Sequence, residues 1–178
     1  MANLDDLYRD IILDHYRSPR NRGELPTPPA RRVEGFNPLC GDELVLYVDV
    51  RDGVLVDIKI TGHGCSISQA SSSLMSAAVK GRPLDEVRET IESFKTMMGL
   101  REASLSEGEA SDDAGDLRSM KEINALAGVV KFPVRIKCAT LAWNTLEQAL
   151  GAPSSGPRRF RRRGPDQEAS VALARKGS

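Results

Sequence analysis

The chain has little cysteine and no long apolar run, and each shortage excludes a class of protein. Three cysteines in 178 residues are an odd number with no closely spaced pair, so a disulfide-rich secreted domain is not expected. No apolar stretch approaches the roughly 18 residues of a transmembrane helix. Residues 1–6 lack the basic and apolar segments of a secretion signal. We therefore expect a cytoplasmic protein that does not enter a membrane.

The chain also has no net charge, so its overall charge gives no reason to expect nucleic-acid binding. That zero hides an asymmetry. Residues 151–178 hold seven basic and two acidic residues, whereas the first 150 residues hold 18 basic and 23 acidic ones. Because 151–178 is also rich in Gly, Pro and Ser, we expect a disordered basic tail. Because residues 158–163 are rich in arginine, an alternative is that the tail binds nucleic acid or an acidic protein.

Hydrophobic periodicity predicts one α+β domain over residues 1–150, with a small three-stranded antiparallel sheet packed against about five helices. The polar segment 101–115 is interpreted as a mobile loop or insertion. Asp52-Gly53 is typical of the turn of a β-hairpin. The expected strands are 31–36, 43–50 and 54–61, and the expected helices are 4–17, 66–80, 83–98, 116–127 and 135–150.

Each cysteine has a neighbourhood that favours a thiolate. Cys40 lies in the sequence Asn-Pro-Leu-Cys-Gly-Asp, beside a flexible glycine. Cys65 follows two glycines at the start of a predicted helix, where unpaired N–H groups favour negative charge. Cys138 lies near the start of the last predicted helix, flanked by the cations Arg135 and Lys137. The three thiols are therefore candidates for metal binding or sulfur chemistry.

Three thiolates and a carboxylate would complete a four-coordinate zinc site, and Asp42 is the nearest candidate for the carboxylate. Such a site would carry excess negative charge, which Arg135 and Lys137 could compensate. A carboxylate is a weaker zinc ligand than a fourth thiolate, so one position could exchange. The intervals between the cysteines match no zinc-finger pattern. Spacing alone therefore leaves open three unrelated buried thiols, with Asp42 as a turn-capping residue.

Four segments carry distinctive motifs, in a fixed order along the chain. They are YRDIILDHYRSPRN at 8–21, NPLCGD at 37–42, GHGCSISQASSSLM at 62–75 and RIKCATLAW at 135–143. Together they closely resemble the IscU/SufU (NifU-like N-terminal) family of iron–sulfur cluster assembly proteins, over about residues 4–150. The resemblance implies an α+β fold with a three-stranded sheet. It also implies that one metal site is surrounded by Cys40, Asp42, Cys65 and Cys138.

Three departures indicate the SufU branch of that family. Lys137 stands where the IscU scaffold branch has a histidine before its last cysteine. Phe132-Pro133-Val134-Arg135 stands where that branch has a Leu-Pro-Pro-Val-Lys chaperone-binding segment. Residues 99–117 resemble an insertion of the SufU branch. This branch implies bound zinc and a role as the sulfur-accepting partner of a cysteine desulfurase, a SufS-like pyridoxal-phosphate enzyme.

The resemblance also implies a mechanism. A histidine of the desulfurase takes over one zinc position, Cys40 is released and accepts the persulfide sulfur, and Asp42, Cys65 and Cys138 keep the metal. A SufBCD-like scaffold would receive the sulfur downstream, so the chain would be a sulfurtransferase-like partner rather than a stand-alone enzyme. The residues themselves do not choose Cys40 over Cys138.

Two alternatives remain open. One is an IscU-type scaffold that assembles a [2Fe-2S] cluster, or holds iron, on the same ligands. The other is a zinc-stabilised interaction module without sulfur chemistry, which chelation would unfold. The two histidines are interpreted as structural. His63 is expected to pack or hydrogen-bond locally, and His15 to lie in the core or at an interface.

Overall fold

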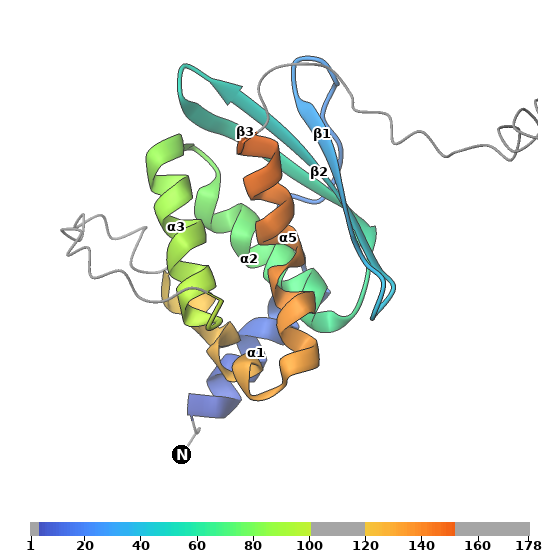
Figure 1. The fold of residues 1–178 in the computed structure, drawn as a ribbon, viewed down its shortest axis with the longest axis vertical. Helices are drawn as coiled ribbons and strands as arrows, with labels where there is room; N and C mark the ends of the chain where they lie inside the picture. Colours follow the sequence, from blue (N-terminus) through green and yellow to red (C-terminus); the bar gives the residue numbers. More distant parts are fainter. Residues whose placement is uncertain (1–3, 101–119, 152–178) are drawn as a thin grey trace, which may run out of the picture.

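The computed structural model describes residues 4–100 and 120–151 (Figure 1). The α+β prediction is confirmed, but the sheet has four antiparallel strands in the order β1-β2-β3-β4 instead of three. The strands are β1 (Arg31–Asn37), β2 (Asp42–Arg51), β3 (Val54–His63) and β4 (Arg82–Pro83). The helices are α1 (Leu4–Arg17), α2 (Ser66–Val79), α3 (Leu84–Met97) and α5 (Pro133–Gly151), with a 3-10 helix, η1, at Asn124–Lys131.

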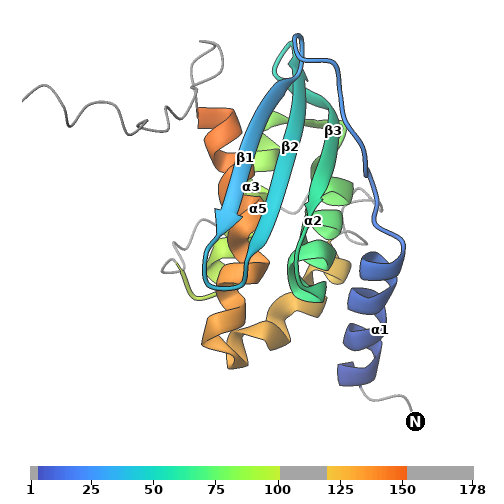
Figure 2. The ribbon, with the colours of Figure 1, turned by 90° about the vertical axis from the view of Figure 1, so that its right-hand side faces the viewer.

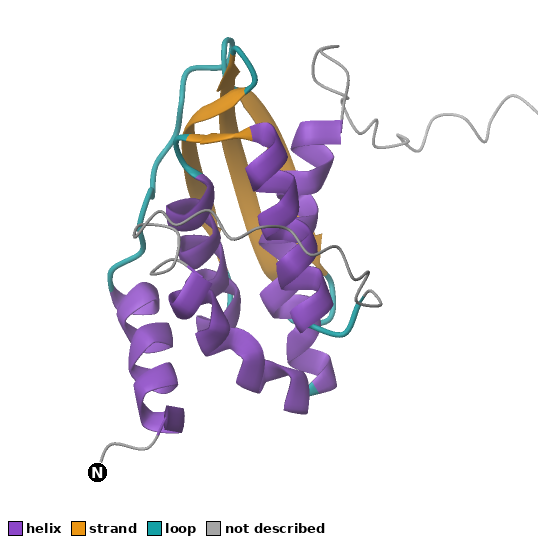
Figure 3. Ribbon diagram, turned by 90° about the vertical axis from the view of Figure 1, so that its left-hand side faces the viewer, coloured by secondary structure: helices purple, strands orange, loops and turns teal. Residues whose placement is uncertain are grey.

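The domain has two layers. Helices α2, α3 and α5 cover one face of the sheet, and α1 packs beside α2 (Figures 2 and 3). No described helix covers the opposite face (Figure 2). Phe94 of α3 stacks on Trp143 of α5, with ring centroids 4.1 Å apart. Both side chains are buried, so this stack joins the two helices at the centre of the core.

The β2–β3 hairpin forms where Asp-Gly predicts it. Asp52 and Gly53 both have positive φ angles, 51° and 75°, as a tight hairpin turn requires. A β-bulge in β3, opposite Asp49 and Val50, interrupts the alternation of inward and outward side chains along this strand. Leu55 is therefore completely buried, and Val56, which strict alternation would put on the same face as the buried Ile58, is 36% exposed.

The fourth strand explains the corrected strand count. β4 consists of Arg82 and Pro83, which pair with Leu55 and Val54 of β3. A two-residue strand has no periodicity that a sequence pattern can reveal. The pairing is extended by a hydrogen bond from the Gly81 N–H to the Leu55 carbonyl, at 2.7 Å.

Two predicted helices differ from the structure by more than one residue at an end. The last helix begins at Pro133 rather than Arg135, because proline suits the first turn of a helix. The helix predicted at 116–127 is α-helical over 120–123 and continues as η1 to Lys131, so the expected end at residue 127 is wrong. Residues 116–119, most of the 99–117 insertion and the tail from 152 lie outside the described residues. In the described part, no helix is long and apolar enough to cross a membrane.

Candidate metal centre

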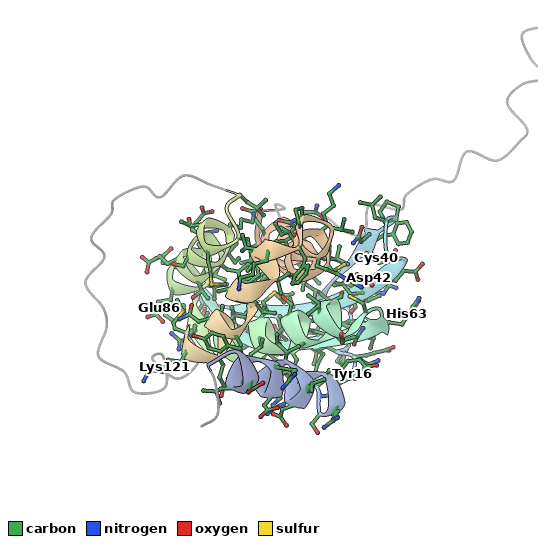
Figure 4. The ribbon with its side chains drawn as sticks, turned by 90° about the horizontal axis from the view of Figure 1, so that it is seen from below. Tyr16, Cys40, Asp42, His63, Glu86 and Lys121 are labelled. Carbon is green, nitrogen blue, oxygen red and sulfur yellow. The ribbon has the colours of Figure 1, made fainter. Side chains whose placement is uncertain are left out.

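Three separate parts of the chain bring the candidate ligands to one end of the sheet. The β1–β2 loop carries Cys40, and Asp42 begins β2 directly after it. Cys65 precedes α2, and Cys138 lies in the second turn of α5. Seen from below in Figure 4, Cys40 and Asp42 lie together at this end, with His63 near them.

Cys40, Asp42 and Cys138 form a compact group. One ligand atom from each of these residues lies within 4.8 Å of the other two. The Cys40 and Cys138 sulfurs are 3.0 Å apart. The group combines two soft thiols with a hard carboxylate, a donor set that suits zinc and also iron. The described residues therefore fit a divalent metal at this position.

Cys65 borders this group through Asp42. Its backbone N–H donates to Asp42 Oδ1 at 2.9 Å, and its sulfur lies 3.9 Å from Asp42 Oδ2. The sulfur also accepts the Ser68 N–H at 3.4 Å and so caps α2. A Cβ on Gly64 would lie only 2.8 Å from Asp42 Oδ1, so glycine is what allows this close approach. Cys65 is not within the three-residue group, and its ligand role stays a prediction.

Burial and crowding of anions make this end of the sheet suitable for a cation. Asp42 is completely buried and Cys138 is 1% exposed, whereas Cys40 is partly exposed. Burial raises the pKa of the Cys138 thiol well above its usual range, and the nearby Cys40, Asp42 and Cys65 add to the effect. A divalent metal would reverse this by stabilising the thiolate.

The two predicted charge-compensating residues differ in their positions. The charge of Cys65, followed by a hydrogen bond with Cys138, raises the pKa of the exposed Arg135 guanidinium above its usual value. Arg135 therefore lies against the sulfurs. Lys137 is exposed and lines a separate surface pocket of about 350 Å³ beside Leu39. The interaction with the two sulfurs is consistent with charge compensation by Arg135, and the role stays a prediction for both residues.

Residues 7–139 match the model of the NifU-like N terminal domain. The chain belongs to the NifU-like N-terminal domain family. The matched range includes all four candidate ligands, and it confirms the resemblance predicted from the motifs.

The NifU-like relatives include both branches considered above. The chain is 42% identical to the zinc-dependent sulfurtransferase SufU of Bacillus subtilis, over 87% of this chain and 97% of that protein. It is 37% identical to the iron–sulfur cluster assembly scaffold protein IscU of Streptococcus pyogenes, over 84% of this chain and 86% of that one.

Solved structures agree with the NifU-like fold. One is described as a putative iron–sulfur cluster assembly scaffold protein for the SUF system of Fervidobacterium islandicum. It superposes with a TM-score of 0.67 at 31% identity, over 83% of this chain and 99% of that chain. A NifU-like protein of Brucella abortus superposes with a TM-score of 0.63 at 25% identity, over 83% and 94% of the two chains.

The two histidines of this NifU-like domain lie outside the three-residue group. His63 ends β3 and is exposed. His15 is 2% exposed, and its Nδ1 lies 2.8 Å from Ser73 Oγ while its Nε2 lies 3.5 Å from Glu122 Oε2. The expectation of a core histidine at His15 is confirmed.

The sequence does not predict a role for Asn37, the first residue of the NPLCGD motif. The structure buries its side chain and places its Nδ2 3.7 Å from the Cys138 sulfur. An Asn-Pro pair after a strand predicts a turn, and this is the one signal in the sequence that points to Asn37. It does not reveal a contact with a residue 101 positions away.

Proposed function

We propose that this protein is a zinc-dependent sulfur acceptor for a cysteine desulfurase in iron–sulfur cluster assembly, and that Cys40 takes the sulfur. The observation that carries the proposal is a partly exposed thiol, Cys40, beside the buried donors Asp42 and Cys138. The similarity to a zinc-dependent sulfurtransferase over nearly its whole length supports this chemistry.

Burial favours Cys40 over Cys138 as the acceptor. Cys138 is 1% exposed within α5, so its sulfur is not accessible to a protein partner in this conformation. Cys40 lies on a short loop next to Gly41, which has a φ of +67° and open space where a Cβ would stand. The loop can therefore shift at low cost while the helix stays in place.

The residues proposed to hold the metal are Cys40, Asp42, Cys65 and Cys138. When bound, Zn²⁺ would keep the adjacent thiols ionised at neutral pH. Arg135 interacts with the Cys65 and Cys138 sulfurs and would offset the excess negative charge, with Lys137 as a second cation.

The proposed transfer conserves atoms and electrons. The Cys40 thiolate attacks the outer sulfur of a persulfide on the desulfurase. A new S–S bond forms on Cys40, the S–S bond of the donor breaks, and the donor cysteine leaves as a thiolate. The exposed Arg135 guanidinium would stabilise the anionic sulfur during this exchange.

The surrounding pathway forms part of the proposal. The sulfur donor would be a SufS-like pyridoxal-phosphate enzyme, and a SufBCD-like scaffold would accept the sulfur afterwards. Both steps would take place in the cytoplasm. The protein would then be a sulfur-transfer partner of the desulfurase rather than a stand-alone enzyme.

A scaffold function is the second candidate, because IscU relatives cover most of the chain. The scaffold protein IscU of Thermotoga maritima is 38% identical over 81% of this chain and 92% of that protein. On this alternative the same four residues would hold a [2Fe-2S] cluster. Anaerobic reconstitution distinguishes the two functions, since a stable coloured cluster that passes to an apo-protein would favour the scaffold.

Metal analysis combined with a desulfurase assay tests the proposal. Freshly isolated protein should contain one zinc per chain and should stimulate cysteine-dependent sulfide production by a SufS-like enzyme. The Cys40→Ala variant should lose that stimulation. Iron in place of zinc, or stimulation that survives the substitution, would contradict the proposal.

A further inference from the structure

Asn37 contacts or adjoins three of the four candidate ligands, although no sequence motif assigns it a role. It is the last residue of β1, is 5% exposed, and pairs directly with Asp42 across the two strands. The loop that carries Cys40 starts immediately after it. Its side chain reaches α5, where it meets Cys138.

The backbone of Asn37 shapes the Cys40 loop. Its carbonyl oxygen accepts the N–H of Gly41 at 2.9 Å and the N–H of Cys40 at 3.3 Å. Its side-chain Oδ1 accepts the N–H of Leu39 at 3.2 Å. These three bonds turn the chain sharply after β1 and place the Cys40 sulfur beside Cys138.

The same side chain donates from its other end. With Oδ1 occupied by the Leu39 N–H, Nδ2 faces the Cys138 sulfur at 3.7 Å. The reversed amide orientation would place a second acceptor against a thiolate and a donor against the Leu39 N–H. Both contacts would then fail, so the two neighbours determine the orientation of the amide.

We propose that Asn37 is a positioning residue that couples the Cys40 loop to Cys138 and stabilises the metal-bound Cys138 thiolate through its Nδ2–H donor. The inference rests on the proposed metal site. A neutral donor suits this depth, because it offsets thiolate charge without placing another ion in the core. It also anchors the base of the loop while Cys40 moves.

Asn37→Asp separates the two functions of the side chain. Aspartate has the same shape and keeps an acceptor for the Leu39 N–H, but it presents a charged acceptor to the Cys138 sulfur. Asn144→Asp is the matched control. Asn144 is an exposed residue of α5 that lines the same surface pocket as Asn37. Asn144→Asp therefore introduces the same negative charge at a position that does not face the Cys138 sulfur.

The experiment uses the full chain and measures Zn²⁺ affinity by competition with a chromophoric chelator. It also records the thiolate-to-metal charge-transfer absorption after Co²⁺ substitution. Asn37→Asp should weaken Zn²⁺ binding by about ten- to a hundredfold, as loss of an outer-shell donor does, and should shift the Co²⁺ band. Asn144→Asp should match the parent in both measurements.

Asn37→Ser provides the test if Asn37→Asp does not fold, which circular dichroism shows. Serine is neutral and too short to reach the Cys138 sulfur, so it should also shift the Co²⁺ band and weaken Zn²⁺ binding. Parent-like affinity and an unshifted band in the folded variants would overturn this inference alone. A parent protein that binds neither metal would overturn the proposed function, and this inference with it.

Discussion

The sulfurs of Cys40 and Cys138 lie 3.0 Å apart, although 98 residues separate them in the chain. One sulfur is carried by a loop and is partly exposed, and the other is buried in a helix. Asp42 lies beside both. This pairing gives the site an accessible thiol and a fixed one, which is the division of roles that the proposed sulfur transfer needs.

The first prediction concerns oxidation of the metal-free protein. After chelation, hydrogen peroxide should join Cys40 to Cys138. Cys40 is oxidised to a sulfenic acid with release of water, and Cys138 then displaces a second water to close the disulfide. Peptide mapping without reductant should find this bond, with Cys65 as a free thiol.

Two controls make that prediction specific. Cys65→Ser should form the same disulfide, and metal-loaded protein should form it more slowly because the thiolates are occupied. A dominant Cys40–Cys65 or Cys65–Cys138 bond would contradict the observed geometry.

The second prediction concerns the contact between β1 and α5. A Cβ on Gly35 would clash with Thr145 Oγ1 and lie 3.3 Å from Leu141 Cδ1. Gly35→Ala should therefore lower the free energy of unfolding by about 1–3 kcal/mol, the usual cost of overpacking. Urea denaturation measures this change.

Gly128→Ala is the control, because no atom lies within 4 Å of its added Cβ, and it should be close to neutral. Adding Thr145→Ala to the Gly35→Ala variant should restore part of the loss, since it removes the clashing hydroxyl. If Gly35→Ala is as stable as Gly128→Ala, the close approach of β1 to α5 is wrong.

The third prediction concerns pH. Burial lowers the pKa of His15 below its ordinary value of 6.5, with a further contribution from Arg20, while Glu122 and Asp14 oppose the shift. The unfolded chain therefore binds a proton more readily than the folded one. Below about pH 6.5 this residue should make the free energy of unfolding fall as pH falls towards the lowered pKa.

His15→Gln removes the titration. In urea denaturation across pH 5–8, the variant should lose less stability on acidification than the parent. At pH 8 it should be less stable than the parent by about 1–2 kcal/mol, through the weakened contact with Ser73. Both proteins have the same metal site, so the difference between their pH profiles reports on His15 alone. Parallel profiles would contradict the lowered pKa of His15 as a cause of acid destabilisation.

Local chemistry explains which parts of the fold could be predicted. Asp52-Gly53 predicts the hairpin because its two residues tolerate the required positive φ angles. β4 was missed because a two-residue strand depends on its partner, β3, rather than on its own pattern. The exposure of Val56 comes from a β-bulge in β3. The bulge arises from the pairing of β3 with β2, so the order of apolar and polar residues in the sequence does not reveal it.

For the candidate metal site, too, the sequence predicts the residues but not the contacts that depend on tertiary packing. The motifs identify the family, and with it Cys40, Asp42, Cys65 and Cys138 as candidate ligands. The preference for Cys40 over Cys138 comes from burial, and burial depends on how α5 packs against the sheet. The contact between Asn37 and Cys138 likewise exists only after residues 101 positions apart are brought together.

The most direct test of the central claim is to locate the transferred sulfur. The zinc-loaded protein is incubated with a SufS-like cysteine desulfurase and cysteine, alkylated, digested and analysed by mass spectrometry. We expect one added sulfur atom on Cys40, none on Cys138, and no added sulfur in Cys40→Ala. Added sulfur on Cys65 or Cys138, or its persistence in Cys40→Ala, would contradict it.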